Sequence, residues 1–372
     1  MKKERIVVKI GSSSLTKPGG ELSRTKLNMY ASAIAQLRTA GHQVILISSG
    51  AVAAGFSGLK YPSRPVTLAG KQAAAAVGQG LLMQAYTEAF SEYGYETGQI
   101  LLTRSNFSNK LQYQNAYATL SELLRRGVIP IINENDTIAV DELTFGDNDM
   151  LSALVGGLIH ADCLLILTDI DGIYDANPKG HPDAKRYQFL SEIPDELYLQ
   201  AGEAGSNVGT GGMRSKLDAA KTAMSLGLRV FIGLGEQENC LVDIISGKGN
   251  GTYIGFSGNE VLNNKKQWLA LHSLPAGELY IDNGAKKALL FKGKSLLPAG
   301  ITTVHGRFES GAVVEVKDIH GRLLGKGQVN MSADELNDIK GKSTAEAAQY
   351  TKTKRPEVIH RDDWVYIEKE RV

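Results

Sequence analysis

Short apolar runs alternate with longer stretches of helical spacing from residue 6 to residue 232 of the chain. Runs this short, bounded by small or polar residues, predict buried strands, and they are Ile6–Ile10, Val44–Ile47, Gln99–Leu102, Val128–Ile132, Cys163–Leu167 and Arg229–Ile232. Helical spacing lies between them, over residues 23–40, 68–93, 109–126, 150–155 and 209–226. This alternation is typical of an α/β fold, an open and mostly parallel sheet with helices on both faces.

From Gly251 onward the pattern changes and helical runs become scarce. Short apolar strings stand between glycines, at residues 277–281, 289–291, 311–316 and 323–329. Such a pattern predicts a small β-rich domain, a barrel or a sandwich. We therefore predict a first domain over 1–256, a linker over 257–275, and a β-rich domain with a charged tail over 276–372.

The composition is that of an ordinary soluble protein of two domains, with 372 residues, 42% of them apolar and 22% charged. The net charge of +1 gives the whole chain no strong field toward nucleic acid or membranes. Two cysteines, Cys163 and Cys240, are too few for a disulfide framework and fit a reducing compartment. Lys9 interrupts the first apolar run too early for a signal peptide, and no run is long enough for a membrane span. We expect a cytoplasmic protein with no membrane partner.

A polar loop between the fourth predicted strand and the next helix is dense in carboxylates and carboxamides. It runs from Asn133 to Ala153, and these side chains are Asn133, Asn135, Asp136, Asp147, Asn148 and Asp149. Such a loop can hold a zwitterion, because it offers partners to an ammonium and to a carboxylate at once. The alternative is a solvated loop in which Asn and Asp simply form turns.

The common phosphate-binding motifs are absent. The tripeptides at 293–295 and 341–343 end like a P-loop, but Ala288 and Leu336 stand where that motif needs glycine. Gly78-Gln-Gly80 begins like a dinucleotide fingerprint, but Met83 occupies its last small position. The seven histidines show no zinc spacing.

Lys9 is the first candidate for binding an anion, because it stands inside an apolar strand, where an unused charge is rarely tolerated. The turn after it, beginning at Gly11, could hold phosphate oxygens on its backbone N–H groups. The alternative is a lysine on an edge strand that discourages aggregation.

The segment Gly209–Lys216 is the second candidate. Its three glycines allow close approach of the backbone to an anion, and the helix that follows points its N-terminal dipole at the same place. Lys216 lies in the first turn, where a cation opposes that dipole, so a negative ligand would compensate it. A flexible glycine hinge is the alternative, and it does not explain Lys216.

Two further loops follow predicted strands. The loop that begins Thr168-Asp169 could contact a ribose or a base, or it could simply reverse the chain. Ser49-Gly50-Ala51 could form a backbone nest for an anion.

Taken in order, five stretches resemble the amino-acid kinase family: Lys9-Ile-Gly-Ser-Ser, Ser49-Gly-Ala, Asn133-Glu-Asn-Asp, Gly146-Asp-Asn-Asp-Met-Leu-Ser-Ala and Gly209-Thr-Gly-Gly-Met-Arg-Ser-Lys. The resemblance covers residues 5 to about 255, and the part from Pro275 onward resembles a PUA domain, a small β-rich barrel. Within the family the chain looks like the members that phosphorylate glutamate. The resemblance implies ATP-dependent phosphorylation of the side-chain carboxylate of L-glutamate to L-glutamyl 5-phosphate, the first step of proline biosynthesis. It also implies Mg²⁺, for which no protein ligand is assigned.

The resemblance further implies roles for individual residues. The catalytic residues would be Lys9, Lys216 and Asp149, with Asp149 holding the two lysines in place. The residues that bind glutamate would be Ser49, Gly50, Asp136 and Asn148. The residues that bind the nucleotide would be Lys9, Gly11, Thr168, Asp169, Thr210, Gly211, Gly212, Met213, Arg214, Ser215 and Lys216.

Two alternatives stay open. A sister kinase could act on aspartate, acetylglutamate, carbamate or a nucleoside monophosphate. An RNA-binding or RNA-modifying protein is the other, because PUA domains often bind RNA and the region carries basic residues, namely Lys286, Lys287, Lys292, Lys294 and Arg307. The family also leads us to expect a homodimer or homotetramer, with proline as a feedback inhibitor.

Overall fold

The computed structural model describes residues 3–138, 148–178, 180–181, 183–198, 212–235, 239–255, 273, 275–347 and 357–367. The chain divides into two compact units, one formed by residues 1–106 and 114–261 and the other by residues 107–113 and 262–372. Each unit has a sheet and a hydrophobic core of its own. The predicted linker over 257–275 lies largely outside the described residues.

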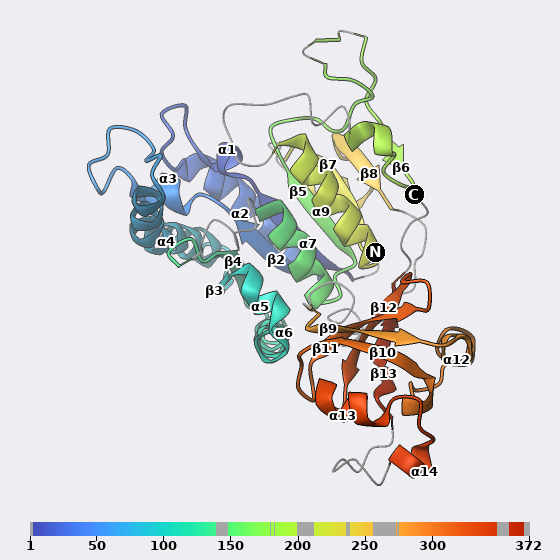
Figure 1. Cartoon of the computed structure of the whole chain (residues 1–372). Helices are drawn as coiled ribbons and strands as arrows, with labels where there is room; N and C mark the ends of the chain where they lie inside the picture. Colours follow the sequence, from blue (N-terminus) through green and yellow to red (C-terminus); the bar gives the residue numbers. More distant parts are fainter. Residues whose placement is uncertain are drawn as a thin grey trace. The chain divides into compact units, whose positions relative to one another are not determined.

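The first unit is built on an eight-stranded sheet in the order β3-β4-β2-β1-β5-β7-β8-β6 (Figure 1). Its strands are β1 (Arg5–Ile10), β2 (Gln43–Ser48), β3 (Thr97–Leu102), β4 (Ile129–Glu134), β5 (Cys163–Leu167), β6 (Phe189–Leu190), β7 (Arg229–Gly233) and β8 (Gly251–Ile254). All neighbours are parallel except β7 and β8. The carboxyl ends of β1, β2, β4 and β5 therefore meet at one edge.

Helices cover both faces of this sheet. On one face α2 (Arg24–Thr39), α4 (Leu68–Ser91) and α10 (Cys240–Ile245) pack onto Ile6, Val8 and Ile10 of β1. On the other face α7 (Asn148–Leu158) packs on β1 and β5, and α9 (Met213–Ser225) packs on β7 (Figure 1). Because side chains alternate along a strand, Val7 and Lys9 point toward α7 and α9. The remaining helices before β4 are α1 (Ser12–Leu15), α3 (Ala51–Gly55), α5 (Arg104–Ser108) and α6 (Lys110–Arg125).

Helices α3 and α4 touch through their backbones. A Cβ atom on Gly55 would lie 2.0 Å from the carbonyl oxygen of Ala74, and one on Gly78 would lie 1.8 Å from the carbonyl oxygen of Ala51. Only glycine fits at either position. Gly50, which precedes α3, has φ of 111°, a conformation that also favours glycine. Three glycines thus fix α4 against the end of β2.

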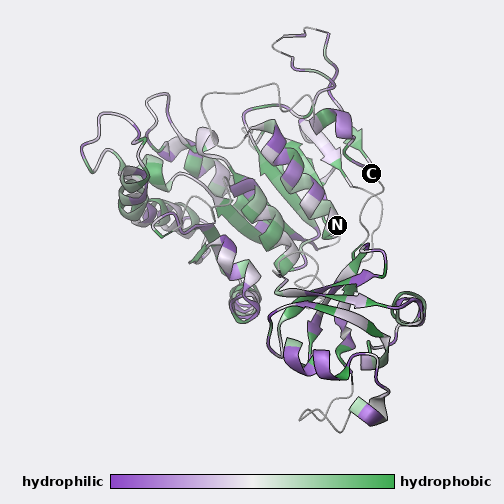
Figure 2. Ribbon diagram, in the orientation of Figure 1, coloured by the Kyte–Doolittle hydropathy of each residue, from purple (hydrophilic) through white to green (hydrophobic). Residues whose placement is uncertain are grey.

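The second unit contains a five-stranded mixed sheet in the order β10-β9-β11-β12-β13. Its strands are β9 (Gly277–Ile281), β10 (Ile301–Gly306), β11 (Val313–Asp318), β12 (Leu323–Val329) and β13 (Ile359–Tyr366). The helices are α12 (Asn283–Lys292), the 3₁₀ turn η3 (Pro298–Gly300), α13 (Ala333–Ile339) and α14 (Thr344–Ala347). Leu279, Val316 and Leu336 are fully buried in its core, and apolar positions concentrate inside both units (Figure 2).

The predicted fold class is confirmed: a mostly parallel α/β sheet with helices on both faces, followed by a β-rich domain. One local prediction was wrong. Residues 289–291 lie in α12, not in a strand, because the Asp282 side chain accepts the N–H of Ala285 at 2.7 Å and begins a helix there. The strands β6 and β8 were not predicted, and no local pattern indicates that β8 runs antiparallel to β7. Within the part of the chain that is described, no helix combines the length and apolar character of a membrane span.

Candidate active site

Lys9, Asp149 and Lys216 come together on the α7–α9 face of the sheet. Lys9 Nζ forms an ion pair with Oδ1 of Asp149, and Lys216 Nζ lies 3.1 Å from Oδ2. Asp149 is fully buried, while Lys9 and Lys216 are only 5% and 7% exposed. Lys9 comes from β1, Asp149 from the first turn of α7 and Lys216 from the first turn of α9. The close packing of α7 on α9 and on β1 brings the three together.

The ionisation of Asp149 is set by this environment. Burial alone would raise the pKa of its carboxyl group, but the charges and hydrogen bonds of Lys9 and Lys216 outweigh burial and hold the pKa below the ordinary value. Ser215 Oγ donates a further hydrogen bond to Oδ2 at 3.3 Å. Asp149 is therefore a fixed anion that keeps two ammonium groups close together, rather than a group poised to accept a proton.

Gly11 lies directly beside this cluster. A Cβ atom on Gly11 would stand 3.7 Å from Lys9 Nζ and 4.0 Å from the carbonyl oxygen of Leu167. At Gly11 the turn after β1 thus places no side chain beside the Lys9 ammonium and the end of β5. A ligand that approaches the Lys9 ammonium from this side meets backbone at Gly11.

A chain of buried amides links the neighbouring strand ends. Asn148 Nδ2 donates to Ser49 Oγ at 2.8 Å and to Asn133 Oδ1 at 2.8 Å. Asn133 Nδ2 in turn donates to Gln79 Oε1 at 3.0 Å. Asn148 is the residue immediately before Asp149, so the amide chain and the lysine cluster share the first turn of α7.

Asp136 lies just beyond β4 and is partly exposed. Burial of its carboxyl group raises the pKa of Asp136 to about 6. The carboxylate is therefore ionised at neutral pH but protonated in mild acid. Ionised, it can act as the partner of a ligand ammonium.

Residues predicted to bind the nucleotide stand at the ends of β5 and at the start of α9. Thr168 Oγ1 donates to Asp169 Oδ1 at 3.1 Å directly after β5. Gly212, Met213, Arg214 and Ser215 lead into or form the first turn of α9, and Arg214 lies over the ring of Tyr198, with its Cζ 5.9 Å from the centroid. Thr210 and Gly211 lie outside the described residues.

The structure thus groups Lys9, Gly11, Asp149, Ser215 and Lys216 in one cluster. It groups Ser49 and Asn148 in the adjoining amide chain, with Gly50 at the start of α3. Among the described contacts, none joins Thr168 or Asp169 to the lysines, although all stand at the same sheet edge. Sequence reasoning missed Gln79, whose only signal was a polar residue at a position of α4 that turns out to be buried.

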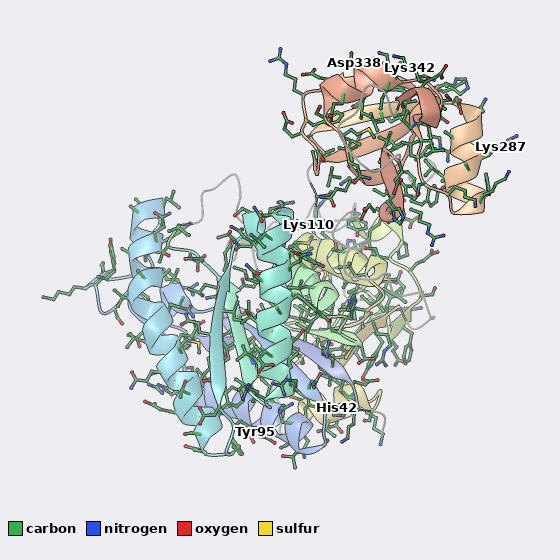
Figure 3. The ribbon with its side chains drawn as sticks, turned by 90° about the horizontal axis from the view of Figure 1, so that it is seen from below. His42, Tyr95, Lys110, Lys287, Asp338 and Lys342 are labelled. Atoms are coloured by element: carbon green, nitrogen blue, oxygen red, sulfur yellow. The ribbon has the colours of Figure 1, made fainter. Side chains whose placement is uncertain are left out.

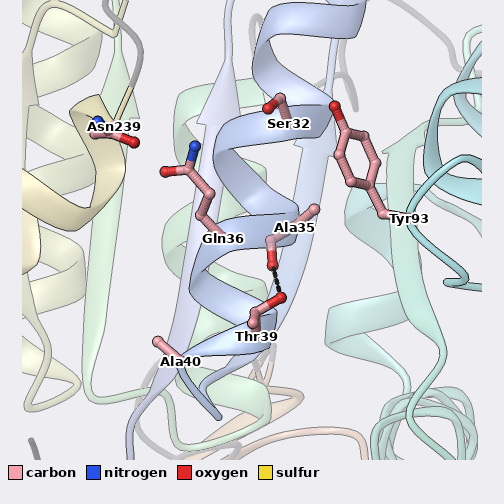
Figure 4. A pocket seen from close by; sticks show the side chains of 7 residues that line it. All are labelled: Ser32, Ala35, Gln36, Thr39, Ala40, Tyr93 and Asn239. Atoms are coloured by element: carbon pink, nitrogen blue, oxygen red, sulfur yellow. Dashed lines mark hydrogen bonds between the residues drawn. The ribbon is translucent and has the colours of Figure 1, made fainter.

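A separate pocket of about 480 Å³ lies elsewhere in the first unit, along α2 (Figure 4). It is lined by Ser32, Ala35, Gln36, Thr39, Ala40, Tyr93 and Asn239. Its α2 residues lie in the second half of that helix, which leads to the start of β2, and none of the lining residues is Lys9, Asp149 or Lys216. It offers no charged side chain. We therefore place the active site by its buried charges and not by this pocket.

Protein ligands for a metal ion are not grouped in the described residues: nowhere there do three or more His, Cys, Asp or Glu side chains form a possible metal site. Asp149, the buried carboxylate of the cluster, is already engaged by two lysines.

The chain belongs to the amino acid kinase family, whose model matches residues 4–233, and a PUA domain model matches residues 277–351. Its similarity to particular proteins extends over nearly the full length. It is 59% identical to the glutamate 5-kinase of Halalkalibacterium halodurans over 370 residues, covering 100% of this chain and 99% of that protein. It is also 59% identical to the glutamate 5-kinase of Bacillus cereus strain G9842 over 367 residues, covering 99% of this chain and 100% of that protein.

A solved structure supports the fold. Carbamate kinase from Giardia lamblia bound to AMP-PNP superposes with a TM-score of 0.50 at 16% identity, covering 68% of this chain and 98% of that one. At this identity the likeness concerns the fold alone.

Proposed function

We propose that this chain transfers the γ-phosphoryl group of ATP to the side-chain carboxylate of L-glutamate, forming L-glutamyl 5-phosphate for proline biosynthesis. The observation that carries the proposal is the pair of buried lysines joined by Asp149 at the carboxyl edge of the sheet, beside a chain of amides. Full-length similarity to glutamate 5-kinases supports the choice of substrate.

The reaction forces two anions together, so the main task of the protein is to position them and offset their charge. An oxygen of the glutamate carboxylate forms a bond to the γ-phosphorus, the bond from phosphorus to the β–γ bridging oxygen breaks, and its electron pair leaves with ADP. The nucleophile is ionised at neutral pH, because a glutamate carboxyl has a pKa of about 4.3. No general base is needed.

Lys9 and Lys216 contact oxygens of the phosphoryl group in transit. Each well-placed donor of this kind is worth about 3 kcal/mol of transition-state stabilisation. Asp149 keeps both ammonium groups in position before the substrates arrive, so little reorganisation is needed at the moment of reaction. The backbone N–H of Gly11 donates a further hydrogen bond to the same oxygens.

Glutamate occupies the region of Ser49, Gly50, Asp136 and Asn148. The Asp136 carboxylate accepts hydrogen bonds from the α-ammonium group of glutamate. The hydroxyl of Ser49 and the backbone N–H groups at Gly50 donate to carboxylate oxygens of glutamate. A loop that offers both signs of partner suits an amino acid better than it suits carbamate or a nucleotide.

The nucleotide lies across the start of α9 and the end of β5. The N-terminal dipole of α9 favours phosphate at Gly212 and Met213. Thr168, Asp169, Thr210, Gly211, Arg214 and Ser215 complete the proposed nucleotide site. Mg²⁺ would arrive with ATP, held chiefly by phosphate oxygens, because the described residues provide no carboxylate cage for it. Bound there, it would offset phosphate charge.

The deciding experiment measures ADP release from Mg-ATP with L-glutamate, L-aspartate, N-acetylglutamate, carbamate and UMP in parallel. L-Glutamate should give at least about a hundredfold higher kcat/KM than the others, since even L-aspartate, which is shorter by one methylene, should be discriminated against by about that factor. Equal or faster turnover of another acceptor would replace glutamate in the proposal. Adding proline to the same assay tests the proposed feedback inhibition.

The cytoplasm is the proposed location, and a homodimer or homotetramer is the proposed assembly, which sedimentation would measure. For the PUA domain we favour a role in assembly or regulation over RNA binding. Lys286, one of its basic residues, is paired with Asp318 at 2.7 Å. Asp338 and Lys342 lie together near the end of α13 and Lys287 projects from α12, so the surface carries both signs (Figure 3). A salt-dependent shift of labelled RNA at sub-micromolar protein would reverse this preference.

A further inference from the structure

One backbone N–H fixes the direction of every hydrogen bond in the amide chain. The N–H of Glu134 can only donate, and it lies 2.9 Å from Asn133 Oδ1. The oxygen of the Asn133 amide is therefore on that side, and its nitrogen must point the other way. There it donates to Gln79 Oε1 at 3.0 Å.

The orientation of the Asn133 amide in turn fixes the orientation of Asn148 and of the Ser49 hydroxyl in the proposed glutamate site. Because the oxygen of the Asn133 amide faces Asn148, the nitrogen of the Asn148 amide must be the donor of the hydrogen bond between them. The same nitrogen also donates to Ser49 Oγ at 2.8 Å and to the carbonyl of Ser48 at 3.3 Å. The Ser49 hydroxyl accepts from Asn148, so its own hydrogen can be donated to a ligand carboxylate. Asn148 keeps Oδ1 as the acceptor that it can offer to a ligand ammonium.

Gln79, at one end of this series of hydrogen-bonded amides, is held firmly in place. It is 8% exposed on α4 and follows Gly78, whose backbone touches α3 so closely that no side chain fits. Helix α3 begins immediately after Ser49 and Gly50. Gln79 therefore lies next to the point where α4 touches α3, and Ser49 lies two residues before α3, so the backbone contact of the two helices limits the movement of one residue relative to the other.

We propose that Gln79 is a positioning residue for the amino-acid substrate, which acts through Asn133 and Asn148 without touching glutamate. Its Oε1 takes up the N–H of Asn133 that would otherwise be buried without an acceptor. Without that acceptor the Asn133 amide keeps its bond from the Glu134 N–H but loses its second anchor, so the acceptor that it offers to Asn148 is less firmly placed. The inference rests on the proposed function, because it assigns Gln79 to the recognition of glutamate.

The test compares Gln79→Met, which keeps the shape of the side chain but removes the acceptor, with Gln79→Glu, which keeps an acceptor. Gln79→Met should raise the KM for L-glutamate about tenfold, the effect of leaving a buried donor without an acceptor, with the KM for ATP changed less than about twofold. Gln79→Glu keeps an acceptor for the Asn133 N–H, so the ratio of its KM values for L-glutamate and ATP should change less than that of Gln79→Met. Gln84→Met is the matched control, because Gln84 is exposed on the same helix and bonds only to Glu88 among the described contacts.

A second readout separates positioning from general damage. Glutarate lacks the α-ammonium group, so the ratio of the affinities for glutamate and glutarate reports recognition of that group. Gln79→Met should lower this ratio about tenfold, whereas a folding defect would weaken both ligands equally. An unchanged ratio, or an equal rise in the KM for ATP, would overturn the role of Gln79. Failure of the unaltered protein to phosphorylate glutamate would instead overturn the proposed function.

Discussion

Lys216 on α9 pairs with Asp149 on α7 at 3.1 Å, and the other oxygen of the same carboxylate is taken by Lys9 on β1. A buried carboxylate without partners would be costly, but Asp149 is paired with both lysines and holds their ammonium groups in place. Replacing Lys9, Asp149 or Lys216 should therefore change both stability and catalysis, by amounts that differ among the three residues.

Replacing either lysine should chiefly affect the chemical step. Lys9→Met or Lys216→Met leaves Asp149 with one ammonium partner, so the fold should persist while kcat falls about 10²- to 10³-fold. Steady-state kinetics together with circular dichroism would check this. The double variant should lose much less than the product of the single losses, because both act on one phosphoryl group. Turnover near that of the unaltered protein in either single variant would refute the assignment.

Replacing the shared acid should chiefly affect stability. Asp149→Asn leaves two nearby ammonium groups without the buried carboxylate, which should lower the free energy of unfolding by about 3–5 kcal/mol. Urea unfolding measures the loss. Ser152→Ala is the control: it removes only a hydrogen bond to the Asp149 carbonyl and should cost about 1 kcal/mol. Equal losses in the two variants would argue against a charge cluster.

Recognition of glutamate should fail in mild acid. Burial raises the pKa of Asp136 to about 6, so lowering the pH from 7 to 5 should protonate it and reduce kcat/KM for glutamate about tenfold. Asp136→Asn should raise the KM for glutamate at pH 7 and show no such fall. A pH profile that is the same in both proteins would remove Asp136 from the site.

The raised pKa of Asp136 also predicts that the ionised carboxylate lowers the stability of the fold, although it favours the binding of glutamate. Because the pKa of Asp136 in the folded protein lies above the ordinary 3.8, the ionised form costs stability at pH 7, and the cost fades as the pH falls from 6 toward 4. Asp136→Asn should therefore raise the free energy of unfolding by about 1–3 kcal/mol at pH 7 and by almost nothing at pH 4. Thermal unfolding at the two pH values would measure this.

Two glycines of α4 should respond oppositely to the same change. Gly78→Ala would force a Cβ into the α3 backbone and should cost about 3 kcal/mol or more. Gly80→Ala meets open space and should stabilise the helix by about 0.5–1 kcal/mol. Unfolding of both variants in urea is a matched comparison. If Gly78→Ala also raises KM for glutamate, the α3–α4 contact supports the site as well as the fold.

Two lysines that conflict with their local sequence pattern lie together in the structure. Lys9 interrupts an apolar strand and Lys216 opposes a helix dipole, and both contact the buried acid. The parallel strands were equally clear, because burial on both faces leaves continuous apolar runs. The role proposed for Asp149 rests on the family resemblance and not on its spacing in the sequence.

Other features depend on contacts that the local sequence does not reveal. Gln79 looks like one more polar residue of an Ala-rich helix until Asn133 is found beside it. The helix at 283–292 was missed because Leu289-Leu-Phe291 suits a strand as well as a helix when its cap is overlooked. The direction of β8 is fixed by its pairing with β7, which no local pattern records.

The three charged groups of the site belong to segments far apart along the chain, on β1, α7 and α9. β1 itself pairs with β2 on one side and β5 on the other, so it is placed only once distant segments have assembled. Turnover is consequently a late marker of renaturation. After dilution from denaturant, helical ellipticity should return first, and enzymatic activity should appear only when the centre of the sheet is complete.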